Sequence, residues 1–199
     1  MRLPSISRAI IAPAALLLAG AVHADLVVNG GFETSDFTGW TQTGDTGFSG
    51  VVCSASPSTS IQSGNCSALF GPVGALGGIS QTLATLAGAT YDISFWLLPD
   101  GGDPSQFIFN WDGGAAELSL SSMPGSPAFI HYQFELAASS ANTSLSFSFR
   151  DDSGFLVLDS VTVNPAATAV PEPGSLALIS LALLAATGST RAGRRLPKH

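Results

Sequence analysis

Short stretches in which apolar and polar residues alternate dominate this chain, and they restrict it to β-structure. Apolar residues fill the odd positions of Tyr91–Leu97 and of 145–149, and the even positions of 130–136. Successive side chains of a strand point to opposite faces, so this spacing predicts strands with one buried and one solvated face. Long amphipathic helical patterns are absent from the sequence. The chain is therefore predicted to be all-β, a two-sheet antiparallel β-sandwich.

Turn signals separate the predicted strands. Asp112-Gly113-Gly114 lies between the strand-like segments Gln106–Trp111 and Ala115–Leu120, and Asp-Gly favours a tight hairpin because both residues tolerate a positive φ. Proline and glycine also interrupt the chain at 99–104 and at 123–127. About nine or ten strands in a jelly-roll topology are expected. A parallel β-helix is the alternative, and it ranks lower because no fixed short repeat is found.

The N-terminal residues 1–24 have the three regions of a secretory signal peptide. A basic start with Arg2 and Arg8 precedes an apolar run, and small residues follow up to Ala24. Cleavage is expected between Ala24 and Asp25. A signal helix is thus predicted to precede a β-sandwich ectodomain at residues 25–165.

The C-terminal residues 166–199 form the second predicted targeting segment. Val170-Pro171-Glu172-Pro173 precedes a hydrophobic segment at 175–187, and a basic tail follows at 191–199. The hydrophobic run is shorter than a comfortable bilayer span, and a short helix is expected there. The basic flank is expected to stay in the cytoplasm.

This arrangement resembles the PEP-CTERM sorting signal of Gram-negative bacteria. The resemblance implies export through the Sec translocon, transient anchoring in the inner membrane, and recognition of Pro171-Glu172-Pro173 by an exosortase that removes the tail. It also implies a cell-surface or extracellular-matrix destination.

The portion between the targeting segments is strongly acidic. Asp25–Val170 holds 13 acidic residues and a single basic one, Arg150, for a formal charge of −12. Such a surface repels phosphate backbones, which excludes nucleic acid as a partner. It also repels anionic polymers unless metal ions bridge the two.

Cys53 and Cys66 are the only cysteines. In an exported protein a lone pair predicts a disulfide. A metal site would need further His or Cys ligands, and Asp25–Val170 contains one histidine, His131, and no third cysteine.

The start and end of the predicted ectodomain resemble those of carbohydrate-binding jelly rolls of the galactose-binding-like type. The matching segments are Leu26–Glu33, followed by Gly39-Trp40, and Leu156–Val163. The resemblance implies that the first and last strands lie together and hold a structural Ca²⁺. Its ligands would be Glu33 and Asp159, with a carbonyl near Asn29. The alternative is that Glu33 caps local backbone and Asp159 faces solvent.

Polar faces of the predicted strands supply the ligand-binding candidates. Trp96 shares a face with Asp92 and Ser94, so it is a candidate platform for a sugar ring, or else a loop covers it. Hydrogen-bonding candidates on polar faces of neighbouring strands are Asn110, His131, Gln133 and Arg150. For Arg150, a salt bridge to Asp92, Asp151 or Asp152 is the competing role. Trp40 and the aromatic stripe Phe107, Phe109, Trp111 are expected in the core.

Catalysis finds little support in the sequence. Asp25–Val170 has no Gly-x-Ser-x-Gly motif and no lysine. Asp151 and Asp152 are adjacent and would point to opposite faces, and Asp100 and Asp103 lie in a turn, where they are solvated or bind a weak cation. The sequence favours a non-catalytic surface or matrix protein that binds or organises exopolysaccharide. The alternatives are a purely structural or adhesive protein and, less favoured, a secreted hydrolase.

Overall fold

The computed structural model describes residues 24–54 and 60–166. The predicted signal segment, the sorting motif at Val170–Pro173 and both predicted flanking helices therefore lie outside the described residues. The chain divides into two compact units, Met1–Pro165 and Ala166–His199, of which only the first is described here. None of the described segments is a helix long and apolar enough to cross a membrane.

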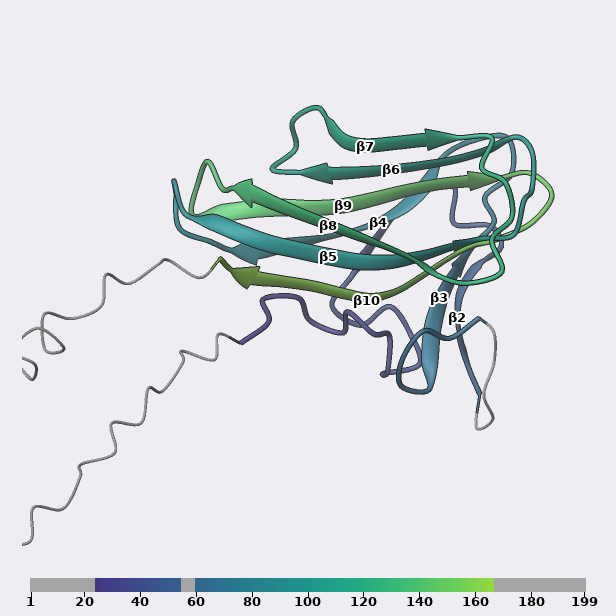
Figure 1. Ribbon diagram of the computed structural model, residues 1–199, viewed down its shortest axis with the longest axis horizontal. Helices are drawn as coiled ribbons and strands as arrows, with labels where there is room; N and C mark the ends of the chain where they lie inside the picture. Colours follow the sequence, from purple (N-terminus) through teal and green to yellow (C-terminus); the bar gives the residue numbers. More distant parts are fainter. Residues whose placement is uncertain (1–23, 55–59, 167–199) are drawn as a thin grey trace, which may run out of the picture. The chain divides into compact units, whose positions relative to one another are not determined.

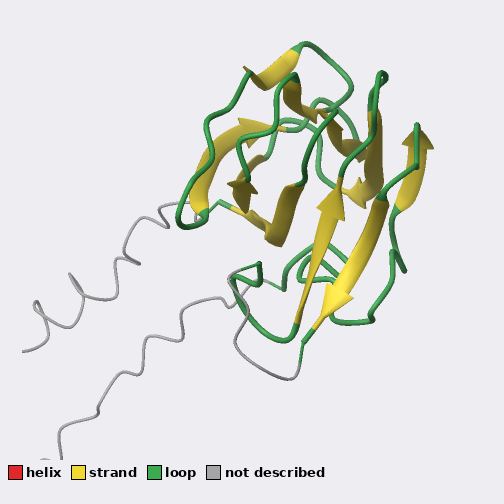
Figure 2. Ribbon diagram, turned by 90° about the vertical axis from the view of Figure 1, so that its right-hand side faces the viewer, coloured by secondary structure: helices red, strands yellow, loops and turns green. Residues whose placement is uncertain are grey.

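Ten strands form two five-stranded antiparallel sheets packed face to face (Figure 1). One sheet has the order β1-β4-β9-β6-β7, with the bounds Thr41–Gly44, Gly77–Ala84, Asn142–Asp151, Ser105–Trp111 and Ala116–Ser121. The other has the order β2-β3-β10-β5-β8, with the bounds Ser49–Cys53, Cys66–Phe70, Leu156–Pro165, Thr90–Pro99 and Ile130–Ala137. Figure 2 shows only strands and loops in the described part. The predicted antiparallel sandwich is confirmed.

The inward faces of the strands follow the predicted alternation. In β5, Tyr91, Ile93 and Phe95 are buried, while the intervening residues are exposed or half-buried. In β6 the predicted core stripe is also confirmed, since Phe107, Phe109 and Trp111 are at most 3% exposed.

Aromatic rings from both sheets fill the core. Phe95 of one sheet contacts Phe107, Phe109 and Phe147 of the other at centroid distances of 5.6, 5.3 and 5.1 Å. Trp40 is buried as predicted, and its indole nitrogen donates to the Asn29 carbonyl at 3.1 Å. Buried aromatic area of this kind is the main source of stability in a sandwich with so few charged contacts.

The predicted hairpin joins β6 to β7. Asp112 and Gly113 have φ angles of 61° and 70°, the left-handed conformation that an Asp-Gly pair adopts at low cost.

The predicted disulfide also forms. Cys53 and Cys66 are cross-strand partners of β2 and β3, and their Cα atoms lie 4.1 Å apart.

The start of the ectodomain differs from the strand implied by the resemblance. Residues 26–33 make turns instead, because Asn29 and Phe32 take φ angles of 56° and 59°. The segment still runs beside the last strand: the Leu26 amide donates to the Val163 carbonyl and the Val161 amide to the Gly30 carbonyl, each at 2.9 Å. The expected proximity of the two ends is therefore confirmed.

Candidate functional site

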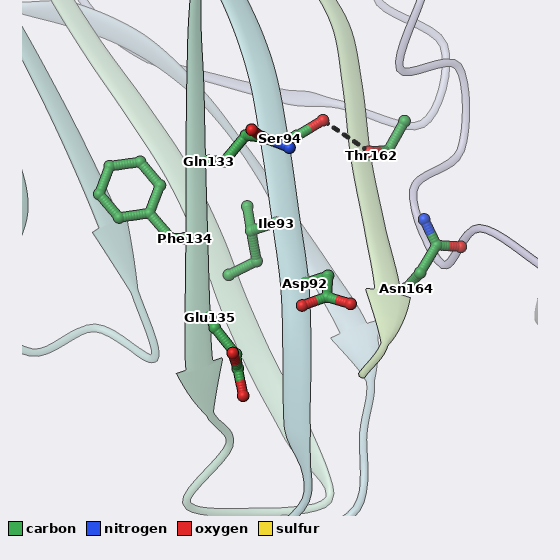
Figure 3. A pocket seen from close by; sticks show the side chains of 8 residues that line it. All are labelled: Asp92, Ile93, Ser94, Gln133, Phe134, Glu135, Thr162 and Asn164. Carbon is green, nitrogen blue, oxygen red and sulfur yellow. Dashed lines mark hydrogen bonds between the residues drawn. The ribbon is translucent and has the colours of Figure 1, made fainter. Parts of the chain in front are cut away.

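A groove of about 530 Å³ lies on the outward face of β5, β8 and β10 (Figure 3). The pleat of the three strands directs polar side chains to this face, because their neighbours along each strand point into the core. The lining residues are Asp92, Ile93, Ser94, Gln133, Phe134, Glu135, Thr162 and Asn164.

Two hydroxyls and an amide stand in one row across the groove. Ser94 pairs with Gln133 on one side and with Thr162 on the other. The Ser94 and Thr162 hydroxyls are hydrogen-bonded at 3.1 Å, as drawn in Figure 3. Hydroxyl and amide groups can both donate and accept hydrogen bonds, so this row suits a ligand rich in hydroxyls.

A bulge in β10 keeps that row in register. The pairing between β10 and β5 shifts between Asp159 and Thr162, where Ser160 takes a φ of 53°. Beyond the bulge Val161 and Val163 are buried, and Thr162 and Asn164 are half-buried on the groove side. The extra residue therefore redirects the polar side chains of β10.

Trp96 and His131 stand one step further along the same face. They are cross-strand partners of β5 and β8, and their rings stack at a centroid distance of 4.2 Å with an interplanar angle of 5°. Trp96 points outward, on the same face as Asp92 and Ser94 as predicted, and it is half-buried. The imidazole ring, however, covers one face of the indole, so that face is closed to a ligand.

The five predicted ligand-binding residues do not form one site. Trp96, His131 and Gln133 share the face described above, whereas Asn110 and Arg150 lie on β6 and β9 of the other sheet. The Asn110 amide donates to the Gly114 carbonyl at 3.3 Å. The Arg150 guanidinium binds Asp152 through two bonds of 2.7 and 2.6 Å, which confirms the salt-bridge role. The prediction that these polar faces are neighbours was wrong, because alternation gives the face of a strand and not the sheet it joins.

A pair of carboxylates in the groove was missed by the sequence reasoning. Asp92 and Glu135 are direct cross-strand partners, both exposed, and both line the groove. Side chains opposed in this way have Cβ atoms about 5 Å apart. Their positions in the polar registers of two strands were visible in the sequence, but the pairing of β5 with β8 was not.

The predicted calcium ligands Glu33 and Asp159 both border Gly31. Glu33 Oε1 accepts the amides of Asn65 and Cys66 at 2.8 and 3.0 Å. Asp159 Oδ2 accepts those of Gln62 and Ser63 at 2.8 and 3.1 Å. Both carboxylates thus hold one segment, residues 62–66.

Asp159 is fully buried, not facing solvent. Burial raises the pKa of its carboxyl, and the hydrogen bonds from Ser63, Gln62 and Ser160 act in the opposite direction. Asp159 Oδ1 accepts the Ser160 amide at 2.6 Å, so both oxygens of this carboxylate, like Glu33 Oε1, already accept hydrogen bonds. The oxygens of Glu33 and Asp159 are of the hard kind that calcium prefers.

Asn29 does not join them. Its backbone carbonyl accepts the Trp40 indole N–H at 3.1 Å and the Phe32 amide at 3.2 Å. Its side chain bonds residues of its own loop, among them Asp36, Thr34 and Thr38. No cluster of three or more His, Cys, Asp or Glu side chains suited to a metal occurs within residues 24–54 and 60–166.

Comparison with known protein families identifies the C-terminal segment. The family model for the PEP-CTERM protein-sorting motif matches residues 169–195. The chain carries an export-sorting signal. It is therefore an exported protein with a segment for transient membrane anchoring. Comparison with curated protein sequences finds no match.

Solved structures similar to the sandwich include carbohydrate-binding modules. TmCBM61, solved in complex with β-1,4-galactotriose, has a TM-score of 0.60 and 20% identity, over 71% of this chain and 99% of that one. The CBM22-1 xylan-binding domain of Paenibacillus barcinonensis Xyn10C has a TM-score of 0.50 and 19% identity, over 76% and 100%. At such identities the similarity shows the fold, and it confirms the resemblance to carbohydrate-binding jelly rolls.

Catalytic proteins also appear among the similar structures. The enzymatically active domain of bacteriophage CBA120 tailspike protein 4 has a TM-score of 0.51 and 16% identity, over 71% of this chain and 21% of that one. The fold therefore occurs both in binding modules and within enzymes, so the fold alone does not determine the function.

Proposed function

We propose that this exported protein binds polysaccharide, without hydrolysing it, in the groove formed by β5, β8 and β10. The observation that carries the proposal is the row of Gln133, Ser94 and Thr162 beside the stacked rings of Trp96 and His131. Hydrogen-bonding groups next to an aromatic surface match the hydroxyls and the apolar ring faces of a sugar. The shared fold of carbohydrate-binding modules supports this choice by analogy.

Binding to a panel of immobilised glycans tests the proposal. Gln133→Ala removes hydrogen bonds and is expected to weaken binding about three- to tenfold, while Trp96→Ala removes ring contact and is expected to weaken it about tenfold or more. Asn110→Ala is the matched control, because Asn110 is a half-buried polar residue on the outward face of the other sheet. Equal affinities for all three variants would place binding elsewhere. No binding to any glycan would favour the structural or adhesive alternative.

A second candidate function, glycoside hydrolysis, rests on Asp92 and Glu135. Retaining glycosidases hold two carboxyl groups about 5 Å apart, a spacing that cross-strand partners can reach. Here both carboxylates are exposed on the floor of one groove, whereas catalysis needs them on either side of the scissile bond. Reducing-sugar release that disappears in Asp92→Asn and in Glu135→Gln would overturn the non-catalytic proposal.

The sorting motif supports a proposal about processing. An exosortase is proposed to recognise Pro171-Glu172-Pro173 after Sec-dependent export, to remove the hydrophobic tail, and to release the domain to the cell surface or matrix, where it organises exopolysaccharide. Mass spectrometry of the native protein tests this sequence of events. Peptides that end close to Pro173, with none beyond, are expected; an intact Arg-rich end would contradict it.

Structural calcium at Glu33 and Asp159 is a further part of the proposal. An ion there would hold the segment 62–66 in place, together with the hydrogen bonds that its backbone amides donate to the two carboxylates. Calcium is expected to raise the melting temperature of the wild type, and this effect is expected to shrink in Glu33→Gln. A melting temperature that EDTA leaves unchanged would contradict the site.

A further inference from the structure

Two turns at one end of the sandwich bring Asp100 and Asp151 together. Asp100 follows β5 directly and Asp151 is the last residue of β9. The turn 100–104 joins β5 to β6, and the turn 152–155 joins β9 to β10. They lie side by side because Ser105 pairs with Asp151 and Leu156 pairs with Pro99.

Hydrogen bonds fasten the two turns to each other. Asp100 accepts the Gly102 amide of its own turn at 2.9 Å and the Phe155 amide of the other turn at 2.7 Å. The Asp103 amide donates to the Ser153 hydroxyl at 3.2 Å, and the Asp152 amide donates to the Pro104 carbonyl at 3.2 Å. The arrangement around the Asp100 carboxylate is therefore fixed before any ligand arrives.

The Asp151 side chain lies beside the Asp100 carboxylate, and one of the Asp151 carboxylate oxygens accepts no hydrogen bond. Its side chain is buried, with only 1% of the residue exposed, and its Oδ2 atom has no hydrogen-bond partner. Oδ1 accepts a long bond of 3.4 Å from the Ser153 amide. Burial first, and then the neighbouring Asp100, raise the pKa of the Asp151 carboxyl, while the backbone amides of Ser153 and Gly154 act in the opposite direction.

Within the described residues, no basic side chain neutralises the negative charge of Asp100 and Asp151. Arg150, the one basic residue of Asp25–Val170, points to the outward face and is engaged by Asp152. Asp151 does border a cavity of about 200 Å³, which is lined also by Phe48, Val73 and Phe155. Phe48 and Val73 are 74% and 49% exposed, so the cavity opens to solvent beside the buried carboxylate.

We propose that Asp100 and Asp151 bind a divalent cation, Ca²⁺, between the turns 100–104 and 152–155. Two carboxylates in contact, one with a buried oxygen that lacks any donor, need positive charge that the surrounding chain does not supply. Ca²⁺ accepts carboxylate oxygens in flexible geometry and completes its shell with water, which the cavity admits. This site shares no residue with Glu33 and Asp159, and it does not depend on the proposed polysaccharide binding.

Calcium titration of the full-length chain by calorimetry, after removal of metals by a chelator, tests the site. The wild type is expected to bind with a Kd of about 10⁻⁴ to 10⁻³ M, the range of extracellular calcium modules. Asp151→Asn is expected to weaken this binding at least tenfold in a Glu33→Gln background, which removes the other proposed site. Asp103→Asn is the matched control, since Asp103 is an exposed carboxylate of the same turn, and it is expected to bind within about twofold of that background.

Two results would overturn the proposal. One is equal calcium affinity with and without Asp151→Asn. The other is that the wild type binds no calcium and that Asp151→Asn is more stable than the wild type at neutral pH. This result would mean that the carboxyls of Asp100 and Asp151 share a proton. If Asp151→Asn does not fold, Mn²⁺ titration of the wild type followed by NMR decides. Selective broadening of the Gly102, Ser153 and Gly154 amides is expected, and its absence counts against the site.

Discussion

On the outward face of β5, the neighbouring His131 ring changes the role that Trp96 can have. Trp96 has the direction and the partial exposure of a sugar platform, but the His131 ring lies parallel to it at 4.2 Å. Cross-strand aromatic pairs stabilise a sheet by some tenths of a kcal/mol to about 1 kcal/mol. The indole thus contributes to the fold through the ring face that contacts His131.

Asp152 provides a prediction at the same scale. Its hydrogen bonds with Arg150 and the Gly74 amide lower the pKa of its carboxyl to about 2, from an ordinary value of 3.8. A lowered folded-state pKa stabilises the fold above the unfolded-state pKa, and this stabilisation is lost as the pH falls through the folded-state value. Asp152→Asn is therefore expected to be less stable than the wild type at pH 7, and the difference is expected to vanish between about pH 4 and pH 2.

Urea unfolding at pH 7, 4 and 2 measures this difference. Asp103→Asn, which removes an exposed carboxylate from a neighbouring turn, serves as the control for net charge. If the difference in unfolding free energy between Asp152→Asn and the wild type stayed constant down to pH 2, it would not arise from the lowered pKa of Asp152.

At the scale of elements, β2, β3 and β10 are held together by contacts far apart in sequence. The disulfide joins the end of β2 to the start of β3. Asp159 of β10 binds the amides of Gln62 and Ser63, in the connection between these strands. The connection is thus held at its ends by a covalent bond and along its second half by a buried carboxylate.

Removing the disulfide tests how much that covalent bond contributes. The double variant Cys53→Ser, Cys66→Ser is expected to lose on the order of 3 kcal/mol of unfolding free energy in the chain-entropy model. Denaturant unfolding of oxidised wild type and of the variant measures it. Faster hydrogen exchange at Gln62 and Ser63 than at Phe95 in the variant is expected, because the loss acts first on the connection. A loss below about 1 kcal/mol would mean that the carboxylate bonds alone hold it.

The whole molecule is an acidic sandwich with distinct ends. The last strand finishes at Pro165, paired with Tyr91, next to the Asp92 and Asn164 end of the groove. The Asp100 and Asp151 turns lie at the opposite end, beside the Leu156–Pro99 pair. The groove therefore lies near Pro165, the last residue of β10, and the proposed cation site lies at the other end of the sandwich.

Net charge gives a prediction at this scale. With 13 acidic residues against Arg150 in Asp25–Val170, and with Asp92 and Glu135 in the groove, a neutral glycan is expected to bind more tightly than an anionic one. Binding to neutral galactan or xylan and to polygalacturonate, compared at about 20 and 200 mM salt, measures this. Salt screens exposed charges, so any weak binding of the anionic polymer is expected to strengthen with salt. Preferential binding of the anionic polymer at low salt would contradict the expectation.

Much of the fold followed from patterns that are local in the chain. Alternation with a period of two identified which residues of β5, β6 and β9 face the core, because the pleat imposes it on every strand. The Asp112-Gly113 turn was predictable because few residues adopt a positive φ at low cost. The cysteine pair needed only composition and the prediction of export.

The sequence by itself determined the class of fold, the inward faces of its strands, the disulfide and the sorting signal. Each of these can be recognised from composition or from patterns of residues that are near each other in the chain. Only the tertiary structure decided which strands lie next to each other. That order separated Asn110 and Arg150 from Gln133, set His131 on Trp96, and brought Asp100 to Asp151. The physical reason is that alternation specifies a face, whereas strand order depends on pairings between segments tens of residues apart, which no single strand encodes.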